Sequence, residues 1–115
     1  MRLTNLLFTT LLLFVSVFAR SQKSNEFTVL QWNVWQEGTM VPGGYDAIVN
    51  EIVRLKPDFV TFSEVRNYNK TNFTARVCAS LKEKGLSYYS FYSYDSGLLS
   101  KHPITDSSTI FPIQD

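Results

Sequence analysis

Residues 27–65 read FTVLQWNVWQEGTMVPGGYDAIVNEIVRLKPDFVTFSEV, and this stretch decides the fold. It begins at 27–34 with β-branched and aromatic residues, which predict a strand. After a loop rich in glycine and proline, apolar side chains recur at helical spacing over 45–55. Pro57 ends that helix, and residues 58–65 form a second apolar run. This order predicts two parallel strands joined by a right-handed crossover.

The rest of the chain extends this pattern. We expect a second helix over 73–84, an aromatic strand over 87–94, a turn at 95–97, a return strand from Leu98 and a further strand over 105–111. The prediction is an α/β fold, with a mixed sheet covered on one face by two helices. Because the strands are apolar at successive positions, both faces of the sheet need cover, and two helices supply it for only one.

The beginning of the chain is typical of a secretory signal peptide. Arg2 supplies a positive charge, residues 6–18 are almost wholly apolar, and small residues lead to an expected cleavage after Ser21. The apolar run is shorter than the roughly 20 residues that a membrane-spanning helix needs, so we expect no stable membrane span. The alternative is a buried N-terminal helix. We predict a signal peptide at 1–21, a domain at 22–115, and a secreted or periplasmic location.

The composition excludes several classes of protein. The 115 residues are 44% hydrophobic and 18% charged, which is ordinary for a globular chain and excludes a disordered tail or a collagen. The net charge is +1, and without residues 1–21 the chain keeps 9 basic and 10 acidic residues. No basic field therefore indicates a nucleic-acid partner. One His and one Cys cannot build a multi-histidine metal site or an internal disulfide.

Two polar side chains stand near the ends of the two predicted parallel strands. These are Asn33 and Glu64. Parallel neighbours bring their carboxyl ends to the same edge of a sheet, where open α/β sheets bind ligands. Amide and carboxylate oxygens suit Mg²⁺ or Ca²⁺, and Mg²⁺ needs few protein ligands because it keeps several waters. The pair is a candidate site for one divalent ion against a phosphate. The alternative is that both residues only mark where the strands leave the sheet.

Three motifs carry a resemblance to a known family. Residues 31–35 (Gln-Trp-Asn-Val-Trp), 57–65 (Pro-Asp-Phe-Val-Thr-Phe-Ser-Glu-Val) and 97–104 (Gly-Leu-Leu-Ser-Lys-His-Pro-Ile) resemble the first three motifs of the endonuclease/exonuclease/phosphatase superfamily. Its members are metal-dependent phosphoesterases related to DNase I and exonuclease III. The resemblance extends from Phe27 to the end of the sequence.

The resemblance implies roles for three residues. Glu64 would be the main protein ligand of a catalytic Mg²⁺, with Mn²⁺ or Ca²⁺ as alternatives, and Asn33 would contact the metal shell or the scissile phosphate. Arg66, in a Glu-Val-Arg run, would face the substrate backbone, and the alternative is an exposed loop arginine. The implied activity is hydrolysis of a phosphoester in nucleic acid, phospholipid or a small molecule.

The resemblance also implies a four-layer α/β/β/α sandwich, of which this chain matches the N-terminal half. The catalytic His, Asp-x-Asn and Ser-Asp-His motifs of the family have no counterpart here, and we interpret the single histidine, His102, as a surface residue. We therefore expect a truncated domain that is inactive alone and lacks the C-terminal half that would cover the second sheet face. The alternative is a non-catalytic exported module that binds through the aromatic residues of 87–94.

Overall fold

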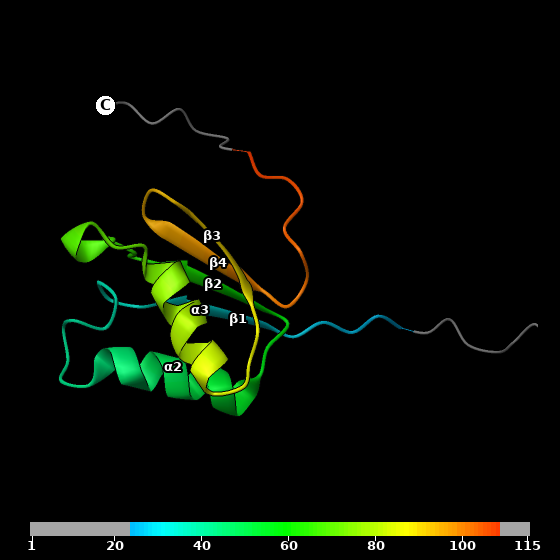
Figure 1. Cartoon of the computed structure of the whole chain (residues 1–115), viewed down its shortest axis with the longest axis horizontal. Helices are drawn as coiled ribbons and strands as arrows, with labels where there is room; N and C mark the ends of the chain where they lie inside the picture. The colour runs from blue at the N-terminus through cyan, green and yellow to red at the C-terminus, as the bar shows by residue number, and fades with distance from the viewer. Residues whose placement is uncertain (1–23, 109–115) are drawn as a thin grey trace, which may run out of the picture.

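One mixed sheet with two helices against one of its faces makes up the fold in the computed structural model, which describes residues 24–108 (Figure 1). The elements in chain order are β1 (Val29–Asn33), α2 (Gly44–Leu55), β2 (Phe59–Ser63), the 3-10 helix η1 (Tyr68–Lys70), α3 (Phe73–Glu83), β3 (Tyr89–Ser93) and β4 (Ser96–Ser100). The predicted α/β class and the mixed sheet are confirmed. The predicted signal peptide lies outside the described residues. Within them, no helix has the length and apolar character needed to cross a membrane.

The sheet has the strand order β1-β2-β4-β3, with β1 and β2 parallel and the other pairs antiparallel. In the parallel pair Asn33 stands opposite Ser63. The predicted strand over 58–65 therefore ends earlier than expected, at Ser63, and Glu64 is the first residue beyond it. This register brings Asn33 and Glu64 to one edge of the sheet.

The core lies between the helices and the sheet. Helix α2 directs Ile48, Val49 and Ile52 into it, and α3 directs Phe73, Val77 and Leu81 at four-residue spacing. Helix α3 begins at a side-chain cap, because the amide of Ala75 donates to Asn72 Oδ1 at 3.0 Å. The sheet contributes Val60, Phe62 and Leu99. These contacts fix α3 over β3 and β4, beside the edge that carries Glu64.

The hairpin turn differs from the prediction at 95–97. Tyr94 and Asp95 make the turn, and Ser96 and Gly97 already pair with β3. Tyr94 takes a left-handed φ of 49°, which a tight two-residue hairpin requires. The glycine at this strand position has a packing reason, since a Cβ there would overlap the methyl group of Thr74 on α3. The further strand expected over 105–111 is absent from residues 105–108, and the remainder of that range lies outside the described residues.

The second face of the sheet carries no helix from residues 24–108 (Figure 1). The register places Val29, Phe59 and Leu98 on this face, together with Phe91 of β3. Phe59 is only half-buried and Val29 is exposed. The expectation that two helices cover only one face is thus met in the part of the chain that the structure describes.

Candidate functional site

The candidate site lies at the carboxyl edge of the parallel strands β1 and β2. Asn33 is the last residue of β1, and Glu64 follows the last residue of β2. Asn33 Nδ2 donates a hydrogen bond of 2.8 Å to Glu64 Oε1. Two side chains separated by 30 intervening residues therefore meet at the point that the strand order predicts.

Each of the two side chains is held by its own backbone surroundings. Asn33 Oδ1 accepts the amide N–H of Trp35 at 2.8 Å, which fixes the orientation of the side-chain amide. Glu64 has a left-handed φ of 61°. For a residue with a side chain this conformation costs about 1–2 kcal/mol, so neighbouring contacts must maintain it. One of them is the hydrogen bond of 3.1 Å from the amide of Val65 to the carbonyl of Asp95 in the hairpin turn.

The Glu64 carboxylate is the group at this edge that could hold a hard divalent cation, because the Asn33 side chain already donates through Nδ2 and accepts through Oδ1. Glu64 is half-buried, and its Oε2 accepts no hydrogen bond from residues 24–108. Those residues contain no group of three or more His, Cys, Asp or Glu side chains that could hold a metal. Zinc sites need three or four such ligands, whereas Mg²⁺ binds through one or two carboxylates and completes its shell with water and phosphate. The oxygen ligands of Glu64 are of the kind that Mg²⁺ binds, and residues 24–108 offer no ligand set of the zinc type.

Arg66 is exposed two residues beyond Glu64 and makes an ion pair with Asp95 of the β3–β4 turn. The two side chains line a shallow hollow together with Val65 and Tyr94. Both side chains are partly exposed, so water screens the pair. Arg66 can therefore reach solvent at the same edge of the sheet.

His102 lies at the other end of the sheet. The register pairs Ser100 with Phe59, the first residue of β2, whereas Glu64 follows the last one. The imidazole packs against the rings of Phe27 and Phe59, with centroid distances of 5.9 and 5.6 Å. His102 is exposed there and stands too far along the strands to act on a group held by Glu64.

A mainly apolar hollow of about 190 Å³ opens beside Asn33. It lies between β1, the loop that follows it and the start of α2. Its walls are largely aromatic and aliphatic, with Trp32, Trp35, Met40, Val41 and Ile48 among the lining side chains. Asn33 itself is among the residues that line this hollow.

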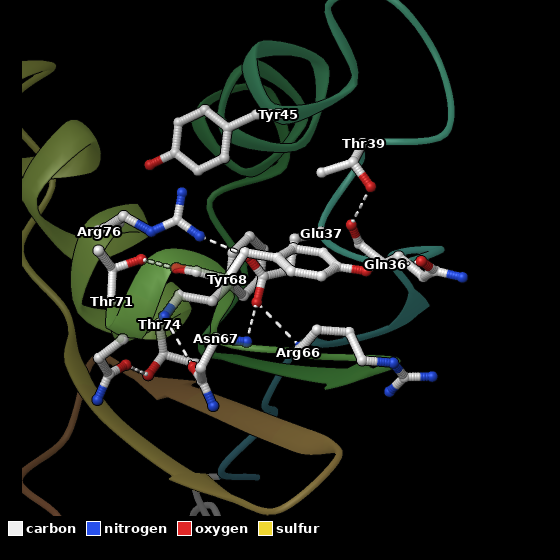
Figure 2. A network of polar contacts seen from close by, with 12 residues as sticks. Gln36, Glu37, Thr39, Tyr45, Arg66, Asn67, Tyr68, Thr71, Thr74 and Arg76 are labelled. Atoms are coloured by element: carbon white, nitrogen blue, oxygen red, sulfur yellow. Dashed lines mark hydrogen bonds and ion pairs between the residues drawn. The ribbon is translucent and has the colours of Figure 1, made fainter.

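Sequence reasoning missed a buried acid, Glu37. Figure 2 shows its carboxylate at the centre of a polar network between the loop after β1, the loop after β2 and helix α3. Only 2% of its surface is exposed. An acid in a loop rich in glycine is usually solvated, so composition gave no signal for this residue. Its burial depends on contacts with residues about 30 to 40 positions away.

Comparison with known proteins gives one family. The model of the Endonuclease/Exonuclease/phosphatase family matches residues 30–115, a range that includes all three site residues predicted from the sequence. No curated protein and no solved structure matches the chain significantly.

Proposed function

The chain belongs to the endonuclease/exonuclease/phosphatase family, and on this premise we propose that it serves metal-dependent hydrolysis of phosphoester bonds at the Asn33–Glu64 edge. The observation that carries the proposal is the direct hydrogen bond between these two side chains where the parallel strands end. Hydrolysis is the general activity of the family. The metal, the substrate and the residue roles given next are our proposals.

Glu64 would hold the cation, Mg²⁺ in the first place with Mn²⁺ or Ca²⁺ as alternatives. When bound, such an ion neutralises phosphate charge and lowers the pKa of a coordinated water. Asn33 keeps the Glu64 carboxylate oriented through Nδ2 and lies beside the metal shell or the scissile phosphate. Arg66 would exchange Asp95 for a phosphate oxygen of the substrate, because a guanidinium binds phosphate with two parallel hydrogen bonds.

The described residues supply binding groups but no general base at this edge. The single histidine is remote, and Asp95 is engaged by Arg66. We propose that residues 24–108 bind the ion and that turnover depends on groups outside them. The substrate is a phosphoester of nucleic acid, phospholipid or a small molecule, and the apolar hollow offers a place for an uncharged part of it. The signal-peptide pattern supports a secreted or periplasmic location.

Titration with Mg²⁺ in a calorimeter tests the proposal. We expect the chain to bind one ion, and Glu64→Gln to abolish binding while the melting temperature stays close to that of the original chain. Glu51→Gln is the matched control, because Glu51 is an exposed acid on α2 whose partner is Arg54. Equal Mg²⁺ affinity in Glu64→Gln and the original chain would contradict the metal role. Mg²⁺-dependent hydrolysis of bis-p-nitrophenyl phosphate by the chain, lost in Glu64→Gln, would confirm the metal role and contradict the inactivity.

The alternative of an aromatic binding module has weaker support. Tyr89, Tyr92 and Tyr94 are exposed, and Tyr94 is 76% exposed. Tyr89 stands opposite Ser100, however, and Tyr92 stands opposite Gly97, so the two tyrosines face opposite sides of the sheet. A single continuous aromatic surface does not follow from this arrangement.

A further inference from the structure

We propose that Glu37 is a positioning residue for the metal site, because its buried carboxylate fixes the loop that carries Glu64 and Arg66. The inference rests on the proposed function and adds a residue that touches neither ion nor substrate. It is drawn from the hydrogen bonds around the carboxylate, from the backbone that delivers it and from the cation that accompanies it.

The carboxylate holds the loop after β2 directly by its backbone. Glu37 Oε1 accepts the amide N–H of Arg66 at 2.9 Å and that of Asn67 at 2.5 Å. The amide of Val65 donates to the carbonyl of Asp95, so three consecutive amides beyond Glu64 are tied down. Glu64 stands immediately before them in a left-handed conformation. Such a backbone persists only where its surroundings determine it, and Glu37 supplies two of the three ties.

The loop after β1 is built to deliver this carboxylate. Trp35, Gln36 and Glu37 have φ values of 41°, 57° and 63°, and Gly38 continues the run at 75°. The amide of Gly38 closes the turn on the carbonyl of Val34 at 2.6 Å. Three successive side-chain-bearing residues in the left-handed region are unfavourable, and strained turns of this kind cluster at functional sites. The turn begins two residues after Asn33. One short segment therefore carries both Asn33 and the carboxylate of Glu37, which holds the loop that follows Glu64.

Helix α3 supplies the balancing charge. Arg76 Nη2 lies 2.5 Å from Glu37 Oε2 (Figure 2). The Arg76 guanidinium also lies over the rings of Tyr45 and Phe73, at 5.5 and 5.6 Å from their centroids. A carboxylate this deeply buried needs such a partner. The ion pair explains why the Glu37 carboxylate can be buried. The hydrogen bonds from the amides of Arg66 and Asn67 explain how the buried carboxylate holds the loop after β2.

Changing the length of the side chain at position 37 distinguishes a positioning role of Glu37 from a role that needs only its negative charge. Glu37→Asp keeps the charge but withdraws the carboxylate by one carbon–carbon bond, about 1.5 Å, so it cannot reach both amides. Glu37→Gln keeps the reach and an accepting oxygen but loses the charge. A positioning role predicts that Glu37→Asp binds Mg²⁺ at least tenfold more weakly than the original chain, in the range of other supporting shells of metal sites. Glu37→Gln keeps an oxygen for both amides but turns an N–H₂ group toward Arg76, so we expect a lower melting temperature and a smaller loss of Mg²⁺ affinity than in Glu37→Asp.

Three measurements on the full chain test this. Calorimetry gives the Mg²⁺ dissociation constant of each variant, thermal unfolding shows that the variant is folded, and hydrogen exchange reports the amides of Arg66 and Asn67. Glu51→Gln again serves as the control and should match the original chain. Weakened Mg²⁺ binding in folded Glu37→Asp, with faster exchange at both amides, is the expected result.

Unchanged Mg²⁺ affinity in folded Glu37→Asp overturns the inference while leaving the proposed function intact. If Glu37→Asp does not fold, hydrogen exchange in the original chain is the test. Rapid exchange of the Arg66 and Asn67 amides there also overturns the inference. Absence of any Mg²⁺ binding by the original chain refutes the proposed function instead, and that result is distinguishable because slow amide exchange would still show the clamp.

Discussion

Replacing Arg76 by methionine tests how the site is held together. The change removes the guanidinium and keeps most of the side-chain volume, which leaves the Glu37 carboxylate, 2% exposed, with two backbone amides as its only partners among the described residues. Removing one partner of a buried ion pair costs about 3–5 kcal/mol. The Arg76 side chain is 38% exposed, so water screens the pair in part, and we expect a loss of about 2–3 kcal/mol.

The measurement is equilibrium unfolding in urea, followed by the fluorescence of Trp32 and Trp35. A small domain is stable by roughly 5–15 kcal/mol, so the midpoint should fall clearly while the denaturant slope stays unchanged. Arg54→Met is the matched control, because Arg54 pairs with Glu51 on the exposed face of α2 and should leave the midpoint where it is. A midpoint for Arg76→Met equal to that of the control would refute the reasoning that the pair is buried and necessary.

Three further predictions concern acid, packing and thiol chemistry. The hydrogen bonds from the backbone and hydroxyl of Thr28 lower the pKa of Asp58 from 3.8 to about 2, so its contribution to stability is present above pH 4 and lost as the pH falls through 2. The difference in melting temperature between Asp58→Asn and the original chain should therefore shrink between pH 5 and pH 2, and a constant difference would contradict this. Gly97→Ala should destabilise the protein by about 1–3 kcal/mol in urea, because the added methyl group overlaps Thr74. Burial raises the pKa of the Cys78 thiol, so iodoacetamide should label it more slowly in the native than in the unfolded chain at pH 8, and equal rates would show that the thiol is open to solvent.

The position of the site could be predicted from the sequence, because it depends on local patterns. Two apolar runs joined by a helix fix a parallel pair, and a parallel pair fixes where Asn33 and Glu64 meet. The hairpin turn was placed wrongly because Asp-Ser-Gly is typical of a turn. Gly97 lies in β4 instead, where a glycine is needed because α3 packs closely against it. Local residue preferences describe the chain in isolation, so they cannot report a contact that another element imposes.

Glu37 could not be predicted for a related reason. Its side chain turns inward within a run of four residues with a left-handed backbone, Trp35 to Gly38, and of these only Gly38 has a residue type that favours that backbone. Its partners, Arg66, Asn67 and Arg76, follow about 30 to 40 residues later. The partner of Arg66 was missed in the same way, since Asp95 lies in a turn as expected but follows Arg66 by about 30 residues.

The two site residues depend on different kinds of support, and this decides which fails first. Asn33 ends a strand and is oriented by the amide of Trp35, two residues away, so its geometry survives any motion that leaves the turn after β1 intact. Glu64 is positioned indirectly, because Glu37 and the hairpin carbonyl of Asp95, from other parts of the chain, accept the amides of the residues that follow it. Loops held by a few distant hydrogen bonds open at lower free energy than the core elements they join. Loosening of α3 or of the β3–β4 turn should therefore displace Glu64 from Asn33 before either strand unfolds.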